Sequence, residues 1–180
     1  MKRILTALFF LAVCISACNS SGSGSGVIND SARTKITLHS FSDTSKLDTF
    51  RISLKGDKPK EMELVFTITP ESGTPVFMKI FKATDLLDNY KDNVDLGKKK
   101  KQVKFLQAEL NLFFAEENFL EPAVTENEEA DKNTPDKNFF AELKETGVNG
   151  FQFRTGKESK VYIAWSVSGQ KVKPYYECCK

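Results

Sequence analysis

Alternating apolar and polar positions run through most of the chain after residue 34 and predict short β-strands. Apolar side chains occupy every second position in residues 50–54, 62–68 and 161–167, a period typical of strands with one buried face. Shorter segments with the same pattern are residues 36–38, 76–80, 151–153 and 171–176, and Pro174 places the last of these at a sheet edge. The pattern predicts a mainly β domain, an antiparallel β-sandwich-like fold with one or two short helices.

Two short segments carry helix-start signals. Thr134-Pro135-Asp136 combines an N-cap hydroxyl with proline at the first helical position. The helix is predicted to continue to about Glu145 and to stop at Gly147, with Phe139, Phe140 and Leu143 facing the sheet. Thr84 is placed to cap a second short helix over residues 85–90.

Residues 102–118 fit two structures. Alternating apolar side chains favour a strand, whereas Leu106, Leu110 and Phe113 also fit one face of a helix. We favour the strand because the alternation holds at five positions: Leu106, Ala108, Leu110, Leu112 and Phe114.

The N-terminus has the pattern of a secretion signal. Lys2 and Arg3 precede a short apolar run over residues 4–13, which is too short for a confident membrane span. Ile15-Ser16-Ala17-Cys18 follows and resembles the lipobox of bacterial lipoproteins. The resemblance implies cleavage after Ala17 and a Cys18 that carries a diacylglycerol and an N-acyl chain such as palmitate. An ordinary secretory signal that ends near a cysteine is the alternative.

These features divide the chain into three parts. Residues 1–17 form the signal peptide, and residues 18–33 contain the lipidated cysteine and a Gly/Ser tract expected to act as a flexible tether. Residues 34–180 form a single β-rich periplasmic domain. Asn19, where an aspartate would favour retention in the inner membrane, indicates an outer-membrane anchor with the domain facing the periplasm.

Composition narrows the function classes. Without residues 1–17 the chain carries 24 basic and 24 acidic residues. A protein that binds nucleic acid carries a clear excess of basic residues, so we expect no nucleic-acid partner. The sequence has no P-loop and no dinucleotide-binding fingerprint. Its one histidine, His39, has no second histidine with which to form a zinc site. We therefore expect no metal, no cofactor and no enzymatic activity; an enzyme would need His39 beside a nucleophile in a cleft.

Cys178 and Cys179 are adjacent, and they are the two cysteines of the predicted domain. In an oxidising compartment free thiols are unusual. Three interpretations remain open: a disulfide between the two, disulfides to a partner or a second copy, and metal or redox chemistry.

Two further sets of residues are candidates for interaction. Lys98, Lys99, Lys100 and Lys101 form a basic cluster suited to anionic lipid headgroups or an acidic partner, while residues 116–131 contain seven acids and no base. Phe77 and Phe81 alternate out of phase with Val76, Met78 and Ile80, so they are predicted on the opposite face of their strand. That face is either covered by a second layer or exposed as a binding surface.

The leading hypothesis is a non-catalytic envelope lipoprotein that docks onto another protein of the periplasm or outer membrane. An anchored small β-sandwich is similar to the outer-membrane lipoprotein of type VI secretion membrane complexes. The segments that carry this similarity are Pro75-Val76-Phe77-Met78-Lys79-Ile80-Phe81 and residues 161–167. It implies the same class of function within that complex. A third hypothesis is a small-ligand binder with a pocket lined by Phe139, Phe140 and Trp165.

Overall fold

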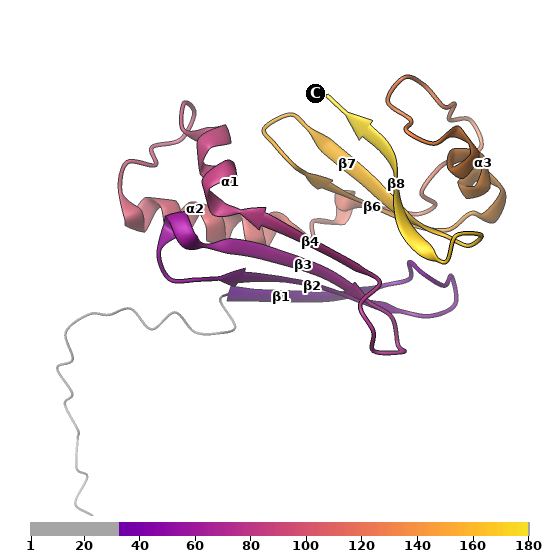
Figure 1. The fold of residues 1–180 in the computed structure, drawn as a ribbon, viewed down its shortest axis with the longest axis horizontal. Coiled ribbons are helices and arrows are strands. Elements are labelled where there is room, and N and C mark those ends of the chain that lie inside the picture. Colours follow the sequence, from indigo (N-terminus) through magenta and orange to yellow (C-terminus); the bar gives the residue numbers. More distant parts are fainter. Residues whose placement is uncertain (1–32, 180) are drawn as a thin grey trace, which may run out of the picture.

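The structure, a computed structural model, describes residues 33–179 and arranges them in two antiparallel sheets of four strands each (Figure 1). In both sheets the strands lie in chain order, so each pairs with the next along the sequence. The mainly β, sandwich-like fold predicted from alternation is confirmed. The first sheet contains β1 (Thr34–His39), β2 (Asp48–Lys55), β3 (Glu63–Thr69) and β4 (Phe77–Lys82). The second contains β5 (Phe119–Leu120), β6 (Gly150–Arg154), β7 (Lys160–Ser166) and β8 (Lys171–Cys178).

The described part of the chain contains three α-helices, two at one end of the domain and one at the other (Figure 1). Helices α1 (Ala83–Tyr90) and α2 (Lys99–Leu112) cover one end of the first sheet on its inner side, and α3 (Lys137–Thr146) lies at the other end beside β7 and β8 (Figure 1). Two short 3-10 turns, η2 (Pro59–Glu61) and η3 (Glu116–Asn118), connect these elements. The second sheet therefore has cover on both faces, whereas the first is covered on its inner face.

Phenylalanine rings fill the space between the sheets. Phe50 and Phe66 from the first sheet are fully buried and contact Phe151 from the second, with ring centroids 5.3 Å apart in each pair. Phe113 and Phe114, which follow α2, complete the same cluster. Aromatic pairs in edge-to-face geometry add to the stabilisation that burial alone provides. A smaller cluster packs under α3 around Phe139, Phe140 and Leu143.

The strand favoured for residues 102–118 is wrong, because most of this segment is the helix α2. Leu106 and Leu110 are buried, one helical turn apart, whereas Leu112 is exposed. Some of the alternating apolar positions also lie on one face of a helix, and the segment is rich in helix formers. The helix, which buries this face, therefore forms in place of the strand.

In the two edge strands of the first sheet, β1 and β4, the set of side chains predicted to face the core faces solvent instead. In β4, Phe77 and Phe81 pack in the core, while Met78 and Ile80 point to solvent. Phe77 and Phe81 are therefore not surface residues available to a partner, which corrects their assignment as interaction residues. The second sheet is the layer that covers them: Phe81 contacts Phe153 with centroids 5.5 Å apart. In β1 the same reversal leaves Ile36 and Leu38 exposed.

The helix predicted from Thr134 forms, with a different cap. Asp136, not Thr134, is the N-cap residue of α3, and its carboxylate accepts hydrogen bonds from the backbone N–H groups of Asn138 and Phe139. The helix ends where predicted, at Gly147, which adopts a positive φ of 61° that glycine tolerates without strain.

Tyr175 supplies a test of the second core cluster. Its side chain is 3% exposed, and its hydroxyl donates to the carbonyl of Ala123 at 2.8 Å. Burial, together with the nearby Glu128 carboxylate, raises the pKa of the phenol above its ordinary value of 10.0. We expect Tyr175→Phe to lower the free energy of unfolding by about 1 kcal/mol at neutral pH.

The same residue is expected to affect stability at alkaline pH. Because the folded state keeps the Tyr175 proton while the unfolded state loses it, wild-type stability should fall as the pH rises above about 10. Urea unfolding of both proteins from neutral to alkaline pH measures this. A variant that loses stability as steeply as wild type would show that Tyr175 does not contribute to the fall.

Candidate functional site

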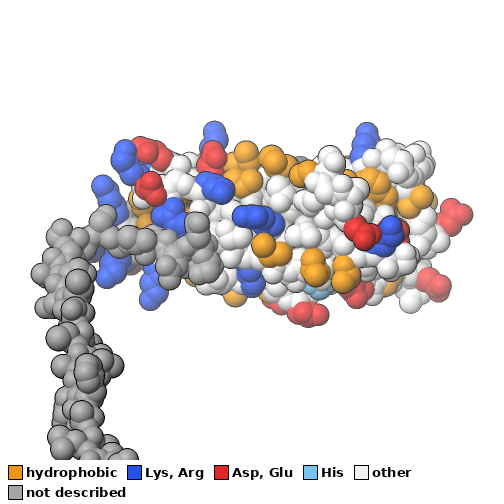
Figure 2. All heavy atoms as spheres, turned by 90° about the horizontal axis from the view of Figure 1, so that it is seen from below, with side chains coloured by type: hydrophobic (Ala, Val, Ile, Leu, Met, Phe, Trp, Pro, Cys, Tyr) orange, Lys and Arg blue, Asp and Glu red, His pale blue; other side chains and the backbone are white. Residues whose placement is uncertain are grey.

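The outer face of the first sheet exposes large apolar side chains and is called the open face. Ile36 and Leu38 on β1 are 54% and 53% exposed, and Met78 and Ile80 on β4 are 60% and 48% exposed. The strand register aligns Ile36 with Met78 across the central strands. Seen from below the sheet, apolar side chains lie over the middle of this face (Figure 2).

Threonine and valine side chains and the exposed Arg51 lie between these apolar residues. The register brings Thr49 opposite Leu38, and Thr67 lies between Arg51 and Met78. Val65, half-buried, lies beside Ile80. The open face thus combines exposed aliphatic side chains with a central arginine on a pleated surface, which suits contact with another protein surface.

The charge on the open face is mainly positive. Lys55, Glu63 and Lys82 form one row across β2, β3 and β4. Arg51 lies in the neighbouring part of β2, where its Nε donates to the Ser53 hydroxyl at 3.3 Å. A surface that fits this face would combine apolar groups with acidic groups, one of them opposite Arg51.

The predicted basic cluster lies at the start of α2 and is exposed. Lys98 is the N-cap residue, and Lys99, Lys100 and Lys101 form the first turn of the helix. Lys101 is paired with Asp95, and this contact, together with the Gly97 N–H, lowers the pKa of the Asp95 carboxyl. Within residues 33–179, none of the ion pairs involves Lys98, Lys99, Lys100 or Lys104.

A cleft of about 600 Å³ opens between the helices and the β6–β7 hairpin. Its apolar wall includes Phe81, Phe113 and Phe153, and charged side chains stand along its sides. The residues that supply this charge are Glu109, Glu117, Arg154, Lys157, Glu158 and Lys160.

Glu109 is a partly buried carboxyl group in the wall of this cleft. Burial raises the pKa of its carboxyl, and the Arg154 charge opposes that shift. Arg154 donates to the Tyr90 hydroxyl at 3.2 Å, and Lys160 donates to Gln152 at 3.3 Å. No feature of the sequence singled out Glu109 or Arg154, because they come from α2 and β6, which are far apart along the chain.

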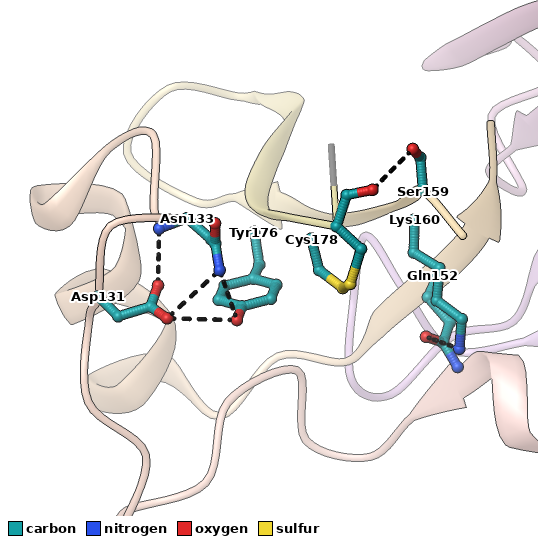
Figure 3. The surroundings of a disulfide bond; sticks show 8 residues. Asp131, Asn133, Gln152, Ser159, Lys160, Tyr176 and Cys178 are labelled. Atoms are coloured by element: carbon teal, nitrogen blue, oxygen red, sulfur yellow. Dashed lines mark hydrogen bonds between the residues drawn. A yellow bond between two sulfur atoms is a disulfide. The ribbon is translucent and has the colours of Figure 1, made fainter. Parts of the chain in front are cut away.

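Cys178 and Cys179 are joined to each other in the structure (Figure 3). This is the first of the three alternatives, and in this state neither sulfur is free to bind a metal or a second chain. The disulfide lies at the end of β8. There the Cys179 carbonyl accepts a hydrogen bond from the Ser159 hydroxyl at 3.0 Å. Cys179 also lines the cleft, so the disulfide forms part of its rim.

His39 is a packing residue in this structure. Its ring stacks on Phe119 with centroids 3.5 Å apart and meets Phe50 edge to face. Its Nδ1 lies 3.7 Å from a Glu121 carboxylate oxygen. Among the described residues these contacts include no serine or cysteine that could serve as a nucleophile.

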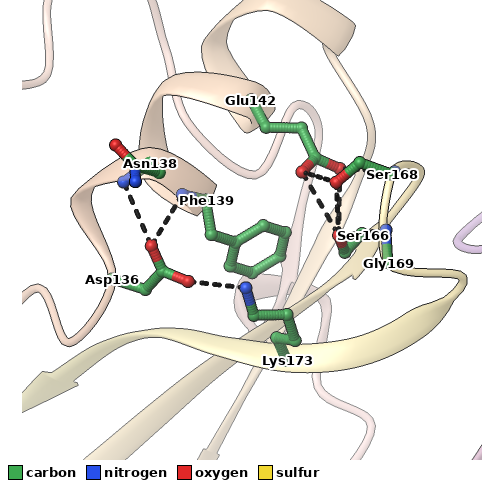
Figure 4. A network of polar contacts seen from close by, with 8 residues as sticks. All are labelled: Asp136, Asn138, Phe139, Glu142, Ser166, Ser168, Gly169 and Lys173. Carbon is green, nitrogen blue, oxygen red and sulfur yellow. Dashed lines mark hydrogen bonds and ion pairs between the residues drawn. The ribbon is translucent and has the colours of Figure 1, made fainter.

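A compact polar cluster beside α3 has a structural explanation (Figure 4). Glu142 accepts hydrogen bonds from the Ser166 and Ser168 hydroxyls, which lie at the turn between β7 and β8. Burial tends to raise the pKa of Glu142, but these hydrogen bonds prevail and lower it. Lys173 donates to Asp136 at 2.6 Å. Together these contacts fasten α3 to the second sheet.

The ligand pocket predicted around Phe139, Phe140 and Trp165 is not assembled by these three residues. Phe139 and Phe140 are buried in the cluster under α3, whereas Trp165 packs against the core between the sheets. A hydrophobic pair on the inner face of a helix is more readily used for packing than for lining an empty pocket.

Comparisons with known proteins give no relative: no family model, no curated protein and no solved structure matches this chain. None of the helices in residues 33–179 has the length and apolar character needed to cross a bilayer. The predicted signal peptide, the segment at residues 15–18 that resembles a lipobox, and the Gly/Ser tract lie outside the described residues, as does Lys180.

Proposed function

We propose that this chain is a lipid-anchored envelope protein that docks a protein partner on its open face and catalyses no reaction. The anchor is inferred from the lipobox at residues 15–18. The observation that carries the docking function is the exposure of Ile36, Leu38, Met78 and Ile80 on one sheet face. Exposed aliphatic side chains gathered on one surface are typical of protein interaction sites.

The partner is a folded protein whose surface combines apolar and acidic groups. The aliphatic residues of the open face provide contact area, and Arg51, Lys55 and Lys82 provide positive charge beside it. An edge-to-edge extension of β4 is disfavoured, because Lys79 places a charge at an inward position of that edge strand. A lipoprotein of a type VI secretion membrane complex is one form of this proposal.

Ligand binding is the second candidate, and the cleft supports it. Its volume of about 600 Å³ falls in the range of small-molecule sites. Apolar rings on one wall and charges of both signs along the sides suit a small amphipathic molecule.

Site-specific photo-crosslinking in living cells tests the docking function. A photoreactive residue replaces Leu38, Met78 or Ile80 in the full chain, and Leu112 or Val167, which are exposed elsewhere, in the controls. We expect the three open-face positions to capture the same protein, and the controls not to capture it.

The captured protein is then tested for direct binding. We expect Met78→Asp to weaken binding of that purified protein at least tenfold, while Val167→Asp leaves the affinity unchanged. Equal capture by the control positions, or equal effects of the two substitutions, contradicts the proposal. Since both side chains are solvent-exposed, neither change should unfold the domain.

A further inference from the structure

Lysines from several elements gather at one end of the domain, which is called the basic end. It comprises the α2 start with Lys98, Lys99, Lys100 and Lys104, the η2 turn with Lys60, and the C-cap of α1, Lys91. Helices α1 and α2 contact each other, and both contact η2, so these lysines share one region of the surface. Blue side chains gather at this end in Figure 2.

Three acids near the basic end are paired with basic side chains, whereas Asp85, Asp88 and Asp92 of the α1 region are in none of the ion pairs of residues 33–179. Asp95 pairs with Lys101, and Glu61 pairs with Lys58. Asp57 pairs with Arg33. Lys98, Lys99, Lys100 and Lys104 are in none of the ion pairs among the described residues. The opposite sign dominates residues 116–131, which contribute seven acids and no base.

The position of the α2 lysines opposes local stability. The N-terminal end of a helix carries partial positive charge, so cations there destabilise it and acids stabilise it. The first turn of α2 contains three lysines and no acid. Features that break a local rule are commonly found where function requires them.

The chain toward Cys18 leaves the domain at this same end. Arg33 is bound to the β2–η2 turn, where its guanidinium donates to the Gly56 carbonyl at 2.7 Å. Lys35, two residues later, donates to the carbonyl of Asn111 at the C-terminal end of α2, so the chain enters the domain beside the η2 part of the basic end and not beside the lysines at the start of α2. Cys18 lies fifteen residues before Arg33, and a chain of that length would span roughly 20 Å if it has the flexibility predicted from the Gly/Ser tract.

From these observations we propose that the basic end contacts an anionic phospholipid surface and fixes the orientation of the domain. The inference rests on the proposed lipid anchor. Acylation of Cys18 keeps the basic end close to the bilayer, and each lysine near an anionic surface strengthens the contact about fivefold. The acid-rich segment is repelled from that surface. The basic end of the domain then faces the bilayer, and the open face remains free to bind a protein partner.

The test measures lysine protection in the acylated protein, reconstituted into vesicles. The vesicles contain either phosphatidylcholine alone or phosphatidylcholine with phosphatidylglycerol, and a membrane-impermeant amine reagent labels exposed lysines. In anionic vesicles we expect Lys98, Lys99 and Lys100 to be labelled at least fivefold more slowly than in neutral ones, an effect that high salt abolishes. Lys132 and Lys137 should react equally in both.

Two matched variants show whether the charge is the cause. Replacing Lys98, Lys99, Lys100 and Lys104 by glutamine should abolish the protection of Lys60. The control removes the same total charge elsewhere, at Lys46, Lys132, Lys137 and Lys171, and should leave that protection intact.

The outcomes separate this inference from the anchor. If the protein floats with both kinds of vesicle but its α2 lysines show no protection, the orientation is overturned and the lipoprotein proposal stands. If the protein does not float with either, both are overturned. Protection seen in native envelopes but not in protein-free anionic vesicles would assign the basic end to an acidic protein, which also overturns the inference.

Discussion

Phe66→Ala is expected to lower the free energy of unfolding by about 4 kcal/mol, the cost typical of a large cavity in a packed core. Phe66 is fully buried in the centre of β3. Its ring contacts six others: Phe50, Phe77, Phe113, Phe114, Phe151 and Phe153.

The effect is large because these six rings come from both sheets and from the segment after α2. They cannot all move inward to fill the space, since the strands that carry them are fixed by their own hydrogen-bond registers. Urea unfolding of the variant measures the change.

Met78→Ala is the control for Phe66→Ala. Met78 lies on β4, beside β3, but its side chain points to solvent, so the substitution should change stability by no more than about 0.5 kcal/mol. Equal effects of the two substitutions would contradict the arrangement of the core between the sheets.

Alternation predicted where strands lie more reliably than which face they bury. In β3 the apolar positions Leu64, Phe66 and Ile68 are all buried, because this central strand has neighbours on both sides and a sheet above it. In β4 both alternating sets contain large apolar side chains, and the rings of Phe77 and Phe81 fill the core although Lys79 lies between them. Ile80 then faces solvent.

Edge position explains the reversal in β1. Its inward side chains do not reach the centre of the sandwich. Lys35 instead donates to the Asn111 carbonyl, and His39 stacks on Phe119. A polar side chain at the margin of a core can satisfy its hydrogen bonds there, so the apolar set is left outside. Single-strand patterns do not contain this information, because it depends on which strand becomes an edge.

The same limit applies to the candidate sites. The lysine cluster is contiguous in sequence and was therefore predictable, whereas the sequence left three interpretations open for the adjacent cysteines, of which the structure has the disulfide between the two. The open face combines β1 with β4, and the cleft combines α2 with β6. Such sites depend on how the elements are arranged. Glu109 and Ile36 become candidate site residues only through neighbours that are distant in sequence.

Cys18→Ser is expected to abolish stable membrane association, the largest effect that a single substitution should have on this chain. Serine cannot form the thioether to diacylglycerol that the lipobox resemblance implies. Each buried acyl methylene contributes about 0.8 kcal/mol, and two or more chains are needed for stable anchoring. Fractionation of cells that express the full chain measures the membrane-bound share.

Cys14→Ser is the matched control, because it removes a thiol four residues earlier and leaves Cys18 in place. This variant should remain in the membrane fraction and carry acyl groups on Cys18, as mass spectrometry of the N-terminal peptide would show. A Cys18→Ser protein that stays in the membrane fraction after a high-salt wash would contradict the lipid anchor.

The salt wash distinguishes the two membrane contacts by their physics. Burial of acyl chains is insensitive to ionic strength, whereas attraction between lysines and anionic lipid is screened over about 8 Å at physiological salt and over less in a wash. Cys18→Ser should therefore leave a small bound fraction at low salt, held by the basic end, that is released by salt. Combining Cys18→Ser with glutamine at the four α2 lysines should remove that fraction as well. A residual fraction that is unaffected by those lysines would show that the basic end does not contact the membrane.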